Sequence, residues 1–224
     1  MTWNAELQQL CYAPLEEQRA LRTGALPTAS VPAPPARLQP GKAVVLSAGK
    51  GHSSWPDSAG NQSEVQITFA LPTDGTMAMF GLVVMAAANP AASGSFFFVD
   101  YTPPLQSVSV TTTWPRTITV GAMTNRSAAA AAGVGKGYSC LDPGVVCAND
   151  TLQLTARDSN VTLRAFVDWN LAECYFQHNR VAISVPAPAT AEAAVAVVST
   201  AAQEVLAAEA WRVGDIWLTE DQST

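Results

Sequence analysis

The chain has 224 residues and a formal net charge of −6; 48% of its residues are hydrophobic and only 13% are charged. This composition can supply the core of one large all-β domain or two small ones, and it excludes global disorder. The three lysines, Lys42, Lys50 and Lys136, are scattered, so no basic cluster predicts a nucleic-acid partner. No apolar run approaches the ~20 residues of a transmembrane helix, and residues 1–6 lack the features of a signal peptide.

Residues 1–40 are predicted to form a linker segment ahead of the main domain. The stretch Pro14–Arg22 favours a short helix that ends at Gly24. Five prolines between residues 27 and 40 exclude a central strand there and predict an extended connector. We therefore expect the main domain to occupy residues 41–224.

Short strand patterns follow one another along the main domain. Residues 64–71 alternate, with Val65, Ile67, Phe69 and Leu71 on one side and Glu64 among the polar residues of the other. Continuous apolar runs are typical of strands covered on both faces, and they occupy residues 79–85 and 96–99. Further strands are predicted at 108–111, 118–120, 152–155, 163–167, 171–176 and 181–185. Turn signals at 168–170 and 178–179 separate the later strands, and this spacing predicts a sandwich or a barrel.

Two segments do not fit the strand pattern. Residues 128–137 combine an alanine run with a glycine-rich stretch and predict a loop insertion. Residues 191–210 are rich in Ala and Glu, so intrinsic propensity alone predicts a helix. The following tail, residues 211–218, returns to a strand pattern, and Trp211 and Trp217 are expected in the core.

The sequence offers few groups for cofactor or metal chemistry. Residues 133–137 read Gly-Val-Gly-Lys-Gly, but their spacing matches no phosphate-binding motif. His52 and His178 stand far apart without partners at ligand spacing, so no metal site is predicted. We expect no cofactor.

The four cysteines divide into two pairs of different character. Cys140 and Cys147 flank a Pro-Gly turn signal that could bring them within disulfide range, the alternative being two free thiols. Cys11 and Cys174 are expected to be buried and unpaired.

Four Asn-x-Ser/Thr sequences are candidate N-glycosylation sites, at Asn61, Asn125, Asn149 and Asn160. They favour passage through a secretory pathway to the cell exterior or an organelle lumen, if the chain derives from a longer precursor. The alternative is a Thr-rich β-protein that meets this loose pattern by chance.

Asp168 and Glu173 are the most enzyme-like pair in the chain. Two carboxylates near an aromatic residue are what glycoside hydrolysis uses. They also stand at the two ends of a tight turn, where an aspartate commonly bonds to its own backbone.

A family resemblance spans nearly the whole chain. Residues 161–176, VTLRAFVDWNLAECYF, resemble the LRVFVDxSxxExF hairpin in the C-terminal domain of glycoside hydrolase family 32, the invertase and fructan hydrolase family. Residues 179–184 resemble the family's next strand, 98–101 a weaker mid-domain VDxS strand, and 193–218 its closing strands. Residues 10–22 resemble the P-x-E-E-x-x-x-L-R linker that leaves the catalytic domain. The motif residues matched in the hairpin region are Arg164, Phe166, Asp168, Glu173 and Arg180.

The resemblance implies a fold and assigns the catalysis to another domain. It implies an all-β, two-sheet antiparallel β-sandwich of jelly-roll or concanavalin-like type with an N-terminal linker helix, and strands within residues 191–210. The family's nucleophile and acid/base lie on a separate N-terminal propeller, in W-M-N-D-P, R-D-P and E-C-P motifs that this sequence lacks. Glu173-Cys174 imitates the last motif, but Tyr175 replaces its proline. We therefore predict no catalytic residue in this chain and assign Asp168 and Glu173 to the structural hairpin.

Three functions remain open at this point. The first is a non-catalytic accessory sandwich that supports a propeller or an oligomer interface, with another protein chain or domain as its partner. The second is a sandwich reused as a structural subunit of a larger assembly. The third is a carbohydrate-binding module that uses its tryptophans for sugar stacking, among them Trp3, Trp55, Trp114 and Trp169.

Overall fold

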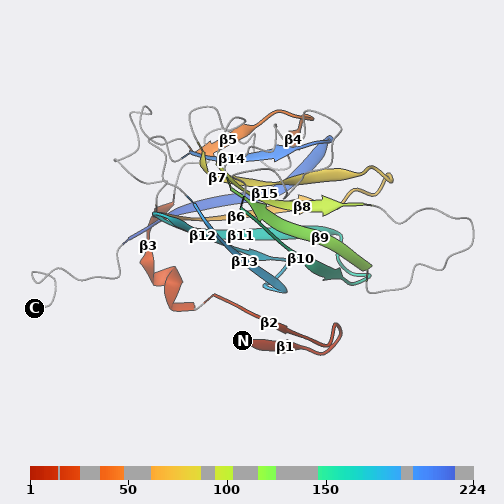
Figure 1. Ribbon diagram of the computed structural model, residues 1–224, viewed down its shortest axis with the longest axis horizontal. Helices are drawn as coiled ribbons and strands as arrows, with labels where there is room; N and C mark the ends of the chain where they lie inside the picture. The colour runs from red at the N-terminus through yellow and green to blue at the C-terminus, as the bar shows by residue number, and fades with distance from the viewer. Residues whose placement is uncertain are drawn as a thin grey trace, which may run out of the picture.

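Two antiparallel sheets make up the body of the molecule in the computed structural model (Figure 1). The structure describes residues 1–14, 16–25, 36–47, 62–86, 94–102, 116–124, 146–187 and 194–214. Every strand pairing within these ranges is antiparallel. The inner faces of the two sheets share one hydrophobic core, so the predicted all-β sandwich is confirmed.

The six-stranded sheet contains the longest apolar strands. In order across the sheet its strands are β10 (Cys147–Leu154), β9 (Arg116–Met123), β8 (Ser95–Tyr101), β7 (Ala78–Ala86), β14 (Ala194–Ser199) and β5 (Val44–Ser47).

The seven-stranded sheet contains the predicted hairpin. In order its strands are β13 (Val181–Pro186), β12 (Leu171–Phe176), β11 (Asn160–Asp168), β6 (Gln62–Ala70), β15 (Gln203–Val213) and β3 (Arg22–Ala25), and β4 (Ala36–Leu38) also pairs with β15. The predicted turn at residues 168–170 joins β11 to β12, as expected.

Alternation along β6 sets the two faces of the seven-stranded sheet. Val65, Ile67 and Phe69 are fully buried against the other sheet, as the alternating pattern predicts. The other side of β6 is less exposed than expected, because Glu64 is also fully buried. Alternation therefore places Glu64 on the outer face, as predicted, but partners that are described below cover it there.

The strands β7 and β8 are buried on both faces, as their continuous apolar sequences predict. One face joins the shared core, while Val83, Phe96 and Phe98 belong to a second apolar cluster. Gly81 allows the two strands to pack closely: a Cβ atom there would lie 1.9 Å from the carbonyl oxygen of Phe97.

The described part of the Ala- and Glu-rich segment, residues 194–210, contains strands, as the family resemblance implies. Residues 194–199 are all buried, and β14 pairs with β5 on one side and β7 on the other. The second half lies in β15, which pairs with β6 through most of its length. Helix propensity differs by well under 1 kcal/mol per residue among such amino acids, so burial in two sheets overrides it.

The predicted linker segment contains both helix and strands. The helix is a 3-10 helix, η1 (Glu16–Leu21), and it leads directly into β3. Residues 22–25 and 36–38 pair with β15 and so belong to the sheet. The domain boundary at residue 40 stays a prediction.

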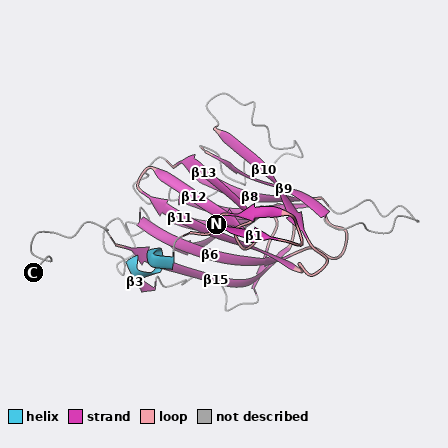
Figure 2. Ribbon diagram, turned by 90° about the horizontal axis from the view of Figure 1, so that it is seen from below, coloured by secondary structure: helices cyan, strands magenta, loops and turns pink. Residues whose placement is uncertain are grey.

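A short hairpin precedes η1 and consists of β1 (Thr2–Asn4) and β2 (Gln9–Cys11). It lies below the sandwich in Figure 1, and β1 lies in front of the seven-stranded sheet in Figure 2. The backbone N–H of Tyr12 donates to the carbonyl of Asn179, which attaches the hairpin to the β12–β13 turn.

Several predictions fall outside the described residues. They concern the strand at 108–111, the insertion at 128–137, His52, Cys140, Asn61, Asn125, Trp55, Trp114 and Trp217.

Candidate functional site: the linker-docking face

The outer side of the seven-stranded sheet holds the linker through a buried ionic cluster. We call this cluster, Arg22, Glu64, Arg164, Phe166 and Trp211, the linker-docking face. Cross-strand pairing places Glu64 of β6 between Phe166 on β11 and Trp211 on β15. Arg22 enters from β3, directly after the linker helix.

Glu64 is the centre of this cluster. Its Oε2 accepts from Arg22 Nε at 2.7 Å, and its Oε1 accepts from Arg22 Nη2 at 2.5 Å and from Arg164 Nε at 2.6 Å. Burial acts to raise the pKa of Glu64, but the hydrogen bonds and charges of the two guanidinium groups outweigh it and hold the pKa below its usual value. The hydrogen bond to Glu64 in turn raises the pKa of Arg22. The carboxylate is therefore ionised and holds the linker against the sheet.

Aromatic rings complete the attachment of the linker. The guanidinium carbon of Arg22 lies 3.6 Å from the centroid of Trp211, and that of Arg164 lies 4.9 Å from the centroid of Phe166. The backbone N–H of Gly214 donates to the carbonyl of Leu21. The expectation that Trp211 lies in the core was wrong: it is half-buried on the outer face beneath Arg22.

The predicted hairpin motif divides between the linker-docking face and the neighbouring strands. Glu173 on β12 accepts a hydrogen bond from Tyr175 Oη at 2.6 Å and from Ser184 Oγ at 3.0 Å. Burial and the hydrogen bond to Glu173 raise the pKa of Tyr175. Asp168 is exposed at the end of β11, where it accepts from Gln62 Nε2 at 3.4 Å. The structure therefore gives both members of the carboxylate pair partners within the sheet.

Arg180, the last motif residue, lies in a separate cluster at the β12–β13 turn. It forms a bidentate ion pair with Asp158, at 2.6 and 3.2 Å, and both side chains are 9% exposed. Burial acts to raise the pKa of Asp158, but the hydrogen bonds from Arg180, the Thr155 backbone and Gln177 lower it to about 2. Gln9 of the N-terminal hairpin donates to the carbonyl of Arg180, so this cluster also supports that hairpin.

The N-terminal hairpin presents exposed apolar side chains. Trp3 is 61% exposed and its cross-strand partner Leu10 is 43% exposed. Met1 and Tyr12 are exposed as well, at 75% and 49%. We call these four residues the hairpin apolar patch. Cys11, on the opposite side of β2, is buried together with Leu7.

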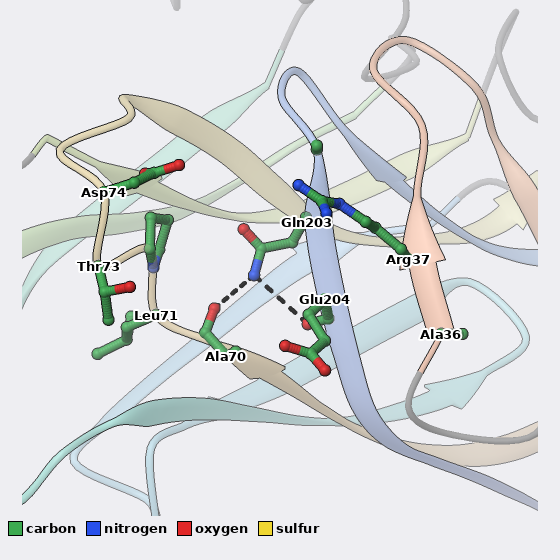
Figure 3. A pocket seen from close by; sticks show the side chains of 10 residues that line it. Ala36, Arg37, Ala70, Leu71, Thr73, Asp74, Gln203 and Glu204 are labelled. Atoms are coloured by element: carbon green, nitrogen blue, oxygen red, sulfur yellow. Dashed lines mark hydrogen bonds between the residues drawn. The ribbon is translucent and has the colours of Figure 1, made fainter.

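Two hollows lie at opposite ends of β6. The first is next to the linker-docking face and is described further below. The second, shown in Figure 3, is lined by exposed polar side chains that include Arg37, Asp74 and Glu204. At its base the Nε2 atom of Gln203 donates to the carbonyl oxygens of Ala70 and Glu204, which ties β15 to the end of β6.

The other candidate residues are placed as follows. Cys147 is disulfide-bonded, and its pairing with Cys140 stays a prediction; Cys11 and Cys174 are free and buried, as expected. Asn149 is exposed on β10 and Asn160 is half-buried at the start of β11, and their glycosylation stays a prediction. His178 is exposed in the β12–β13 turn.

Neither a cluster of metal ligands nor a membrane-spanning helix occurs in the described parts of the chain. Within these ranges, no three His, Cys, Asp or Glu side chains gather as metal ligands would. No helix there has the length and apolar character needed to cross a membrane.

Sequence reasoning missed Arg22, Glu64, Asp158 and Trp211. Strand alternation assigns Glu64 to a face but does not reveal that two arginines cover it. Arg164 could have indicated the role of Glu64. This motif arginine lies on a strand, and a charged side chain within a sheet is stabilised by an opposite charge on the neighbouring strand. Arg22 could not be placed, because the path of the linker is set by tertiary structure.

Comparisons with known proteins agree with this architecture. The family model described as "Glycosyl hydrolases family 32 C terminal" matches residues 36–212. A search of curated proteins gave no match.

Solved structures show the same fold at low sequence identity. Fructan 1-exohydrolase IIa from Cichorium intybus is 18% identical with a TM-score of 0.62, and the match covers 95% of this chain and 40% of that one. Exo-inulinase from Aspergillus awamori is 13% identical with a TM-score of 0.53, covering 92% and 33%. The exoplasmic/lumenal domain of VIP36, in a Ca²⁺- and Man2-bound form, is 12% identical with a TM-score of 0.51, covering 90% and 85%.

The chain thus spans well under half of the length of the two hydrolases. The matched region contains β4 to β14 entirely and all but the last residue of β15, and so nearly the whole sandwich. The chain belongs to glycosyl hydrolase family 32 and contains that family's C-terminal domain.

Proposed function

We propose that this chain is the non-catalytic accessory β-sandwich of an invertase-like glycoside hydrolase, and that it supports a catalytic propeller. The observation that carries the proposal is the bond between Glu64 and Arg22, which attaches the end of the linker helix to the sheet. A linker held by a buried ion pair and by β-pairing can set the position of whatever domain it joins. The family's action on sucrose and fructans would then belong to the complete enzyme.

The hairpin apolar patch supports the same proposal. Trp3 and Leu10 are large, exposed and adjacent, which is the character of a protein contact surface. The hairpin is itself attached to the sandwich at Asn179 and Arg180. A propeller seated on this patch would therefore be held by the linker and by the hairpin together.

A hydrolysis assay tests the non-catalytic part of the proposal. The purified 224-residue chain is expected to release no reducing sugar from sucrose or inulin, because Asp168 and Glu173 serve the hairpin. Glu173→Gln serves as the matched variant. Sugar release by the chain that disappears in this variant would overturn the proposal.

The second candidate is a structural subunit of a larger assembly, and the same apolar patch favours it. In that case the patch would contact a chain that carries no propeller. A stable complex of fixed composition without a family 32 propeller would support this candidate over the first.

A further inference from the structure

The first of the two hollows lies where η1 meets the ends of β6, β11 and β15. It encloses about 540 Å³, within the usual range for small-molecule sites. Its lining includes Gln18 and Leu21 from η1, Gln62 from β6, Phe166 and Asp168 from β11, and Trp169 from the β11–β12 turn.

Trp169 is an unusual residue for its position. Its side chain is 48% exposed and its backbone φ is +51°, in the left-handed region that hairpin turns normally fill with Gly or Asn. Neither turn geometry nor core packing accounts for a tryptophan here. An unfavourable conformation that persists at an exposed ring is a reason to look for a function of that ring.

The polar groups around the Trp169 ring are planar, and they include both hydrogen-bond donors and hydrogen-bond acceptors. Gln62 offers a carboxamide and Asp168 a carboxylate on the same side of the hollow. Gln18 also lines the hollow, but its Oε1 atom is buried and has no hydrogen-bond partner among the described residues. Because that atom has almost no accessible surface, the polar groups offered to a ligand in the hollow are those of Gln62 and Asp168.

The charge and the aromatic rings of this hollow disfavour some classes of ligand and favour another. Asp168 is the one charged residue of the described lining, which disfavours an anion. The guanidinium of Arg164 already lies over the ring of Phe166, so the hollow does not offer a cation an aromatic cage. A saccharide fits, because each hydroxyl both donates and accepts while the carbon–hydrogen face of the ring packs on an aromatic plane.

We propose that this hollow binds one ring of a neutral saccharide. The Trp169 indole packs against the face of the sugar ring, and Gln62 and Asp168 bond to its hydroxyls. Because Gln18 and Leu21 of the linker helix line the hollow together with residues of the sheet, the bound sugar lies between the two. This site does not depend on the presence of a propeller.

The chain can be titrated with sucrose, 1-kestose, maltose and mannobiose, and the indole N–H resonance of each tryptophan followed by NMR. A saturable shift of the Trp169 resonance at millimolar sugar is expected with at least one of them. The resonance of Trp3, the most exposed tryptophan of the described residues, is expected to stay unchanged.

Trp169→Asn separates binding from folding. Asparagine tolerates a positive φ, so this variant is expected to keep the thermal midpoint of the parent chain while weakening the sugar at least tenfold. Trp3→Asn is the matched control and leaves affinity unchanged. Asp168→Asn, which keeps the size of the side chain, is expected to weaken binding several-fold.

Three results would overturn the proposal. The first is the absence of a Trp169 shift with all four sugars, and the second is equal weakening by Trp3→Asn. The third is a Trp169-dependent shift with tetramethylammonium but with none of the sugars, which would assign the hollow to cations.

Discussion

At the scale of single residues, the molecule depends on two carboxylates that composition does not single out. Glu64 joins three strands of the outer face by ion pairs, and Asp158 joins two turns. Glu64 is fully buried, the Asp158 side chain is 9% exposed, and each is bonded to at least one guanidinium group. Such pairs are costly to form, but removing one partner is costlier because it leaves a charge without compensation.

Glu64→Gln is the most direct test of the linker attachment. The change keeps the volume but leaves Arg22 and Arg164, 21% and 14% exposed, without the carboxylate to which both are bonded. The free energy of unfolding is expected to fall by about 3 kcal/mol in urea titrations. Asp150→Asn, at an exposed acid of β10, is the matched control. A loss no larger than the control's would contradict the assigned role of Glu64.

The lowered pKa of Asp158 predicts how the stability of the folded chain changes at acid pH. Its pKa of about 2 in the folded chain lies below its ordinary value, so the unfolded chain binds a proton first as the pH falls. The lowered pKa of Asp158 stabilises the folded chain by about 2 kcal/mol. This stabilisation is complete above about pH 4 and is lost as the pH falls through 2. Asp158→Asn is expected to be less stable at neutral pH and to show a shallower loss of stability between pH 4 and 2. Parallel curves of stability against pH for variant and parent would contradict this.

At the scale of elements, the sequence predicts the strands of β6, β7, β8, β11, β12 and β13 well. A strand buried on one face has an alternating sequence, and a strand buried on both faces has a continuous apolar one. Burial in the sandwich therefore leaves a pattern in the sequence of these strands. The residues at 191–210 show where this reasoning fails. Their composition favours a helix, and only the surrounding sheets make them β14 and β15. The resemblance to the family predicted strands in this segment, whereas propensity predicted a helix.

The candidate site was less predictable than the strands. The motif residues Arg164, Phe166 and Glu173 were found by resemblance, but their contacts were not. Arg22 and Trp211 come together with Glu64 because β3 and β6 pair with the two edges of β15. Such contacts between segments far apart in the chain leave no local pattern in the sequence.

Close packing of β7 on β8 gives a prediction for the six-stranded sheet. Gly81→Ala would place a methyl group against the Phe97 carbonyl, and the backbone would have to shift. The free energy of unfolding is expected to fall by about 2 kcal/mol or more. Gly24→Ala, where nothing lies within 4 Å of the added atom, is the matched control. Equal stability of both variants would show that the two strands are not packed this closely.

At the scale of the whole molecule, the sandwich carries an exposed apolar surface on a hairpin that is attached to it by hydrogen bonds. The N-terminal hairpin contacts the Asp158–Arg180 turn directly, and the linker helix is held at the linker-docking face, whereas the hairpin apolar patch is left exposed. A domain with its own core and an exposed, anchored apolar patch is suited to hold another folded unit.

The double change Trp3→Ser and Leu10→Ser tests this patch. Because both side chains are exposed, the stability of the isolated chain is expected to stay within about 0.5 kcal/mol of the parent. Under the proposed accessory role, association with a family 32 propeller is expected to weaken more than tenfold in sedimentation or calorimetry, since buried aromatic anchors dominate interfaces. Leu206→Ser is the matched control, at an exposed leucine of β15. Equal weakening by the control would remove the patch from the interface.

The most direct test of the account is to purify the native protein from its source with an antibody against this chain, and to identify its polypeptides by intact mass and peptide sequencing. A family 32 propeller is expected in the same polypeptide or in a stoichiometric partner, together with hydrolysis of sucrose or a fructan by the purified material. A monodisperse chain of 224 residues, with no propeller and no such activity, would contradict the proposed accessory role.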